Sequence, residues 1–187
     1  MRDLLIISSL LSLLILIGCG GDALTEEEKK AGKVDTETID SISKDQNSAS
    51  NVQRISESMA NVLAQYKSGE LEKDLVKVEN GLRFKIVAEG KGEKPRFGDR
   101  VFVHYYGMLH DGFKFDSSFD RMKPFSFELG SQGVIPGWND GISRMRSGSS
   151  YIFFLPSDLG YGAYGSPDGS IPPNSELIFF VSLMGFQ

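Results

Sequence analysis

The chain has 187 residues, of which 40% are hydrophobic and 24% charged, so it is long enough for one ordinary folded domain with additional segments. Its formal net charge of −5 leaves no cationic surplus to neutralise phosphates, which excludes a basic nucleic-acid-binding protein. A single Cys excludes a disulfide framework and a cysteine-cluster metal site, and only two His remain for zinc ligation.

The N-terminus carries an apolar run over residues 4–17 that ends at Gly18-Cys19. This run is shorter than the roughly 20 residues that a membrane-spanning helix needs, and it has the length of a secretory signal. We therefore predict that residues 1–18 are a signal peptide. Residues 16–19 resemble a bacterial lipobox, in which cleavage before the Cys leaves a lipidated Cys19. Two alternatives remain open: an ordinary cleaved signal that leaves a free thiol, and a short uncleaved anchor.

A polar, acidic segment follows. Residues 19–50 contain no aromatic residue and are rich in Glu, Lys, Ser, Asp and Thr. Such a segment buries too little apolar surface to offset its chain entropy, so we predict a flexible tether. Gly20 stands where an Asp would favour retention in the inner membrane, so a lipid on Cys19 is expected to lead to the outer membrane.

The next segment has the spacing of an amphipathic helix. Its apolar residues follow a 3-4-3-4 spacing and are Val52, Ile55, Met59, Val62 and Tyr66. Gly69 lies where such a helix would end, and we predict a helical leader over residues 51–75. Its apolar face either packs on the following domain or pairs with a second copy in a homodimer through residues 51–68. Two heptads are too short for a stable coiled coil alone.

From residue 76 onward the chain is rich in aromatic residues, and we predict that residues 76–187 form the folded domain. Alternating or β-branched runs predict strands over residues 82–86, 101–108, 150–155 and 177–183, with a hairpin turn at Asp111-Gly112. Trp138, Ile142 and Met145 follow Pro136 at the spacing of one short helix. The expected fold class is α+β, with an antiparallel sheet packed on that helix.

The motifs of common enzyme classes are missing or out of place. Residues 160–165 match G-x-G-x-x-G, but the Pro-rich stretch that follows cannot open the helix that a dinucleotide site needs. His104 lies within a predicted strand and is expected to be a structural imidazole, whereas His110 lies at the hairpin tip. Asp116 and Asp120 alone are too few ligands to predict a cation site. We therefore predict no cofactor and no metal.

A series of short motifs recurs in the same order as in a known family. They are Val103-His104-Tyr105-Tyr106-Gly107, Phe115-Asp116-Ser117-Ser118, Pro124-Phe125, Val134-Ile135-Pro136-Gly137-Trp138, Tyr161-Gly162 and Ile171-Pro172-Pro173-Asn174. Through them, residues 81–183 resemble the FKBP-type peptidyl-prolyl cis-trans isomerases. The resemblance implies an FKBP-like half-barrel sheet wrapped around the helix of Trp138. With the lipobox, the chain is similar to lipoprotein members of the macrophage infectivity potentiator group, although its leader is much shorter than the dimerisation arm of that group.

The resemblance also implies a cleft for a prolyl ring. Trp138 would form the floor, Tyr161 would offer its hydroxyl to a substrate carbonyl, and Asp116 would be tied to Tyr105 or Arg121 at the rim. The implied catalytic residues are Tyr105, Phe115, Asp116, Phe125, Trp138, Tyr161 and Phe179, and the implied substrate-binding residues are Val134, Ile135, Ile171 and Arg121. Gly133 departs from the family pattern, where many members carry a longer side chain, and the loop of residues 166–170 is about one residue longer than in the smallest members.

The resemblance therefore implies a peptidyl-prolyl cis-trans isomerase, or rotamase, that assists protein folding in the bacterial cell envelope. Its partners would be proline-containing unfolded or folding polypeptides, macrolide inhibitors, and the membrane through the N-terminal lipid, but no nucleic acid. An alternative hypothesis is a non-catalytic chaperone module that binds substrates on the same fold. A third is an unrelated β-rich envelope protein with a purely structural core.

Overall fold

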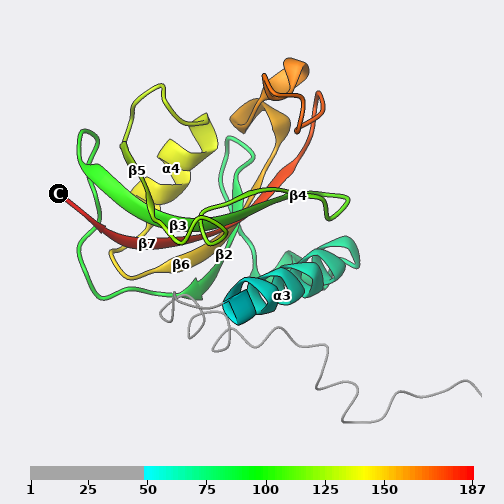
Figure 1. Ribbon diagram of the computed structural model, residues 1–187, viewed down its shortest axis with the longest axis horizontal. Helices are drawn as coiled ribbons and strands as arrows, with labels where there is room; N and C mark the ends of the chain where they lie inside the picture. Colours follow the sequence, from blue (N-terminus) through cyan, green and yellow to red (C-terminus); the bar gives the residue numbers. More distant parts are fainter. Residues whose placement is uncertain (1–48) are drawn as a thin grey trace, which may run out of the picture. The chain divides into compact units, whose positions relative to one another are not determined.

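The computed structural model describes residues 49–187, so the predicted signal peptide, Cys19 and nearly all of the predicted tether lie outside the described residues. The elements in chain order are α3 (Ala49–Lys67), the 3₁₀ turn η1 (Glu70–Asp74), β1 (Val76–Lys77), β2 (Arg83–Ala88), β3 (Arg100–Leu109), β4 (Lys114–Ser117), β5 (Phe125–Glu128), α4 (Pro136–Arg144), β6 (Ser150–Leu155), the 3₁₀ turns η2 (Ser157–Leu159) and η3 (Gly162–Tyr164), and β7 (Leu177–Phe186) (Figure 1).

The strands form one antiparallel sheet in the order β1-β2-β6-β7-β3-β4, and β5 also pairs with β3. The longest ladder joins β3 and β7, with Val101 opposite Phe186 at one end and Leu109 opposite Leu177 at the other. The outer strands β1 and β4 do not pair with each other, so the sheet is open. The predicted α+β class and the four predicted strands are confirmed. The strands β1, β4 and β5 were not predicted, because two to four residues are too few to show an alternation.

The two faces of the sheet carry separate hydrophobic cores. In β7, Phe179 and Val181 belong to the core that includes Trp138 of α4, whereas Ile178 and Phe180 belong to the core that includes α3. This division follows from the strand geometry, because successive side chains point to opposite faces. The two helices accordingly cover opposite faces of the same strands (Figure 1).

The helix α4 lies unusually close to β6 because of two glycines. Pro136 occupies its first turn, where a missing backbone N–H costs no hydrogen bond. A Cβ atom added to Gly137 would lie 2.7 Å from a methyl carbon of Leu155, and one added to Gly141 would lie 2.8 Å from the ring of Phe153. The helix therefore contacts the strand through its backbone, which holds Trp138 against the sheet.

The helix α3 packs on the other face of the sheet within the same chain. Its residues Ile55, Met59 and Val62 are at most 1% exposed and contribute to the core that contains Phe154 and Phe180. The structure therefore shows the first of the two alternatives for this apolar face, which is packing on the following domain. Gly69, with a φ of 78°, follows the helix at the position where the sequence predicted its end.

Polar contacts fasten the C-terminal end of α3 to the sheet. The hydroxyl of Tyr66 donates to Oε1 of Glu176 at 2.9 Å, and Nη2 of Arg83 donates to the same oxygen at 2.6 Å. The guanidinium carbon of Arg83 also lies 5.2 Å from the centre of the Tyr66 ring. Burial raises the pKa of Tyr66 to about 12, and the hydrogen bond to the Glu176 carboxylate adds to this rise.

Two local expectations can be compared with the structure. Ile86 continues the alternation of the buried Leu82 and Phe84 but is 43% exposed, and the pairing of β2 with β6 changes register directly after it, between Ile86 and Ala88. Residues 160–165 contain the single 3₁₀ turn η3 and open no α-helix, as the neighbouring prolines predicted. Among the described residues, no helix is long and apolar enough to cross a membrane.

Candidate functional site

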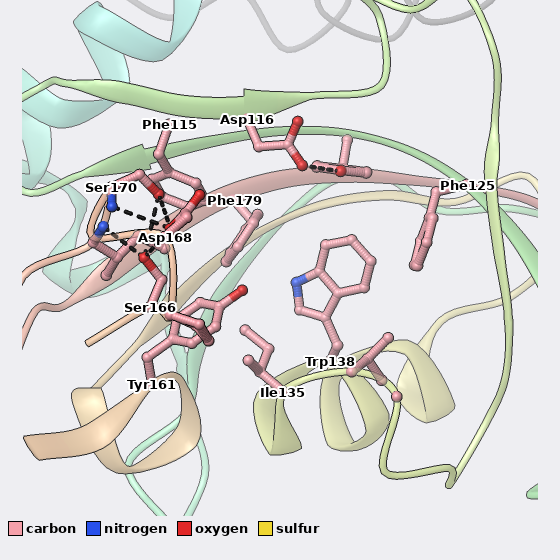
Figure 2. Close-up of a pocket in the computed structure, with 15 residues that line it drawn as sticks. Phe115, Asp116, Phe125, Ile135, Trp138, Tyr161, Ser166, Asp168, Ser170 and Phe179 are labelled. Carbon is pink, nitrogen blue, oxygen red and sulfur yellow. Dashed lines mark hydrogen bonds between the residues drawn. The ribbon is translucent and has the colours of Figure 1, made fainter. Parts of the chain in front are cut away.

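A cavity of about 530 Å³ opens between the helix α4, one face of the strands β3, β4 and β7, and the loop that follows η3 (Figure 2). Its lining residues are Tyr105, Phe115, Asp116, Phe125, Gly133, Val134, Ile135, Trp138, Tyr161, Ser166, Pro167, Asp168, Ser170, Ile171 and Phe179. We call this cavity the aromatic cleft. Every residue that the sequence predicted for the site lines it except Arg121, which contacts two of the lining side chains from outside, and Cys19, predicted only for lipidation and outside the described residues.

Trp138 lies at the bottom of the aromatic cleft and is only 4% exposed. Its indole meets the ring of Tyr105 edge-to-face at 4.9 Å between centroids and that of Phe179 at 5.3 Å. Phe125 contacts it in the same manner at 5.9 Å. The indole Nε1 is buried and has no hydrogen-bond acceptor among the described residues, so the ring provides an aromatic floor that carries one unpaired N–H donor.

The wall formed by Phe115 and Phe179 depends on a glycine behind it. The two rings lie edge-to-face with centroids 5.4 Å apart. A Cβ atom added to Gly107 of β3 would lie 2.7 Å from ring carbons of both phenylalanines. Any larger residue at this position would push the two rings toward the space where a ligand would bind.

A hydrogen-bonded group of three side chains forms the polar rim. Tyr105 donates its hydroxyl to Oδ2 of Asp116, while Arg121 donates Nη1 to Oδ1 of Asp116 and Nη2 to the Tyr105 hydroxyl, the latter at 2.6 Å. Asp116 is therefore tied to both residues that the sequence offered as alternatives. Burial would raise the pKa of Asp116, but the hydrogen bonds from Arg121 and Tyr105 outweigh it and leave the pKa below its usual value. Asp116 is thus a carboxylate at neutral pH.

Tyr161 faces Trp138 from the other side of the aromatic cleft (Figure 2). Its hydroxyl has no hydrogen-bond partner among the described residues, and the residue is 38% exposed. Burial raises the pKa of Tyr161, and the charges of Asp168 and Asp116 raise it further, so the phenol keeps its proton at neutral pH. The hydroxyl can therefore act as a donor to a bound molecule.

Sequence reasoning did not single out the residues of the overhanging loop. Ser166, Pro167, Asp168 and Ser170 all line the aromatic cleft, whereas the resemblance implied only a loop over the cleft that is about one residue longer than in the smallest members, with no role for these side chains. Oδ1 of Asp168 accepts hydrogen bonds from the hydroxyls of Ser166 at 2.5 Å and Ser170 at 2.8 Å. Alternating Ser and Asp residues in a loop are the signal that could have indicated such side-chain contacts.

Gly133 also lines the aromatic cleft, and it leaves space there. A Cβ atom added at this position would have only one close neighbour, Oγ of Ser131 at 3.6 Å. The absence of a side chain thus makes the cleft more open on this side than a longer residue would.

The remaining candidates do not form a site. His104 is buried, its Nδ1 lies 3.0 Å from Oγ of Ser118, and its ring stacks on Phe119, as expected for a structural imidazole. His110 contacts the ring of Tyr66 edge-to-face, and Asp120 pairs with Lys114 at 2.7 Å. Within residues 49–187 no group of three or more His, Cys, Asp or Glu side chains could hold a metal ion.

Comparison with known proteins identifies the class of this arrangement. The family of FKBP-type peptidyl-prolyl cis-trans isomerases matches residues 91–184. The isomerase FkpA of Aeromonas hydrophila is 46% identical over 124 residues, which cover 66% of this chain and 45% of that protein. FK506-binding protein 1 of Dictyostelium discoideum is 44% identical over 107 residues, which cover 57% of this chain and 99% of that protein.

A solved structure agrees with these matches. The crystal structure of FkpA from Escherichia coli superposes with a TM-score of 0.59 at 32% identity, covering 88% of this chain and 74% of that one. The chain belongs to the family of FKBP-type peptidyl-prolyl cis-trans isomerases, as the ordered motifs of its sequence predicted. Its matched part nevertheless spans less than half the length of the FkpA sequences that it resembles.

Proposed function

We propose that this protein is an active peptidyl-prolyl cis-trans isomerase that binds a substrate prolyl ring in the aromatic cleft. The observation that supports this most directly is that the cleft is open. Its aromatic walls enclose about 530 Å³, and the side chains of the surrounding residues leave that space free. A cleft filled by its own side chains would have no room for proline.

The reaction requires no covalent chemistry from the protein. Amide resonance creates a barrier of roughly 18–20 kcal/mol to rotation about the peptide bond, and unassisted isomerisation of a prolyl bond takes tens of seconds. In the twisted transition state the amide loses much of its charge separation. An apolar cleft over Trp138 therefore binds the twisted state better than the planar one, which lowers the barrier. A roughly 1,000-fold acceleration needs only about 4 kcal/mol of such differential binding.

The polar residues would orient the substrate. Tyr161 would donate its hydroxyl to a substrate carbonyl next to the proline and so fix the ring over Trp138. Arg121 would act through Asp116 and Tyr105, because its guanidinium holds both side chains in place at the rim. Phe115, Phe125 and Phe179, with the aliphatic Val134, Ile135 and Ile171, would exclude water from the bond that rotates.

The N-terminal sequence indicates where the enzyme would act. We infer from the lipobox-like residues 16–19 that Cys19 carries a lipid and that the domain assists folding of proline-containing polypeptides in the cell envelope, with the outer membrane favoured. A homodimer through residues 51–68 is not included, since Ile55, Met59 and Val62 already pack on the sheet of the same chain. Macrolide ligands would compete for the aromatic cleft.

The proposal is tested by an isomerisation assay on an Ala-Pro peptide, with the full chain solubilised in a mild detergent. We expect Trp138→Leu and Phe125→Ala each to lower kcat/KM by about tenfold or more, because each removes aromatic surface that contacts the prolyl ring. Phe113→Ala is the matched control, since Phe113 is 56% exposed and lies outside the cleft lining. Turnover that is the same in the cleft variants and in the wild type would contradict the proposal, as would a failure of macrolide to inhibit.

A further inference from the structure

Two carboxylates line the aromatic cleft, and their charges are balanced differently. Asp116 is paired with the guanidinium of Arg121. Asp168 has no Lys, Arg or His partner among the described residues, and its hydrogen-bond donors are the neutral groups of Ser166 and Ser170. No Lys or Arg is among the residues that line the cleft. Asp168 is therefore an unbalanced negative charge on its wall.

The carboxylate of Asp168 is held in a fixed orientation with one oxygen left over. Oδ1 accepts the two serine hydroxyls and also the backbone N–H of Ser170 at 3.1 Å. Oδ2 has no hydrogen-bond partner among the described residues. The surrounding loop is closed by hydrogen bonds between Ser166 and Ile171, one in which the Ile171 N–H donates to Oγ of Ser166 and one in which the Ser166 N–H donates to the Ile171 carbonyl, both at 2.9 Å. The free oxygen is thus preorganised.

We propose that Asp168 is a specificity-determining residue that selects substrates carrying a Lys or Arg side chain next to the proline. Oδ2 would accept a hydrogen bond from the ammonium or guanidinium group, and an acidic side chain in the same place would be repelled. Because Asp168 and Trp138 line the same cavity, the side chain that reaches Asp168 belongs to a residue adjacent to the bound proline. This inference rests on the proposed isomerase function and adds a charge preference to it.

The test compares peptides that differ in one charge. The full chain in detergent is assayed on peptides with Lys, Gln or Glu immediately before the proline, and on a second set with these residues immediately after it. Asp168 is exposed, so at low ionic strength we expect kcat/KM to be roughly fivefold higher for Lys than for Glu in at least one set, as a solvent-exposed charge pair would give. Added salt should reduce this ratio, because exposed charges are screened.

The variant Asp168→Asn removes the charge and keeps an oxygen that can accept the serine hydroxyls. It should bring the Lys-to-Glu ratio close to one. Asp158→Asn is the control, because it makes the same change in net charge at an exposed residue outside the cleft lining, and it should leave the ratio at the wild-type value. A thermal melt of each variant verifies that it is folded.

The outcomes separate the two hypotheses. If the wild-type chain isomerises the Gln peptides but shows no preference for Lys over Glu, the proposed specificity role of Asp168 is contradicted and the proposed isomerase function stands. The proposed role of Asp168 is also contradicted if Asp168→Asn keeps the wild-type Lys-to-Glu ratio, or if Asp158→Asn reduces this ratio as much as Asp168→Asn does. If no peptide is isomerised, the proposed function itself fails.

Discussion

The hydroxyl of Tyr161 has no hydrogen-bond partner among the described residues, and Tyr161 lines the aromatic cleft opposite Trp138. An exposed hydroxyl forms hydrogen bonds with water, but a bound proline would displace that water from the aromatic cleft. We expect a substrate carbonyl to replace the water as the acceptor. This hydroxyl would then contribute to catalysis through a hydrogen bond to the substrate and not through support for the fold.

Replacing Tyr161 with Phe removes only the hydroxyl. We expect kcat/KM for an Ala-Pro peptide to fall by roughly three- to tenfold, as the loss of one hydrogen bond would give, while the melting temperature stays the same. Tyr164→Phe is the control, because Tyr164 is 93% exposed and lies outside the cleft lining. A Tyr161→Phe variant with wild-type kcat/KM would show that the hydroxyl does not bind the substrate.

His104 is a buried titratable residue on the face of β3 opposite to the aromatic cleft. Burial lowers its pKa, because the charged imidazolium loses its hydration there. The unfolded chain therefore takes up a proton near pH 6.5, where the folded chain does not. The contribution of His104 to stability is complete above about pH 6.5 and is lost as the pH falls toward the lowered pKa.

Urea unfolding between pH 7 and pH 5.5 measures this effect. We expect the free energy of unfolding of the wild type to decrease over this interval, with a slope of at most about 1.4 kcal/mol per pH unit from this residue. His104→Asn should abolish that part of the slope, whatever its effect on stability at pH 7. His110→Asn should retain it, since His110 is exposed at the hairpin. Equal slopes in the wild type and in His104→Asn would rule out the assignment.

At the scale of elements, α3 belongs to the core of the domain. The sequence predicted this helix from the periodicity of its apolar residues, but the same periodicity fits a homodimer equally well. The sequence did not reveal the surface of the sheet on which this helix packs. Tyr106, Ile178 and Phe180 lie within runs of consecutive buried residues, 103–109 in β3 and 177–183 in β7, so no alternation indicates a second apolar face.

Truncation of a buried α3 residue tests whether the helix contributes to stability. Met59→Ala should lower the free energy of unfolding by about 2–5 kcal/mol, because Met59 is 1% exposed and its loss leaves a cavity against the sheet. Asn61→Ala, on the exposed side of the same helix, should change it by less than about 0.5 kcal/mol. Chemical denaturation of both variants gives the comparison. Equal stabilities would mean that α3 is not docked in solution.

At the scale of the whole described chain, the residues that line the aromatic cleft could be predicted from the sequence more fully than the hydrogen bonds that they make. Aromatic and glycine positions recur in ordered motifs, so the lining of the aromatic cleft could be predicted from the sequence by resemblance. The hydrogen bonds of Asp168 could not, because side-chain directions in an irregular loop follow from backbone angles that no periodicity encodes. The sequence also left open whether Asp116 bonds to Tyr105 or to Arg121, and the structure shows both contacts.

The two hydrophobic cores are separated only by the single sheet, and both pack against it. Phe179 touches the space for the ligand, and its neighbour Phe180 supports the leader helix from behind. We therefore expect the fit of α3 against the sheet to affect how rigidly Phe179 is held in the wall of the aromatic cleft. An exchange of α3 for another leader segment would then change the turnover of a prolyl peptide without altering any residue that lines the aromatic cleft.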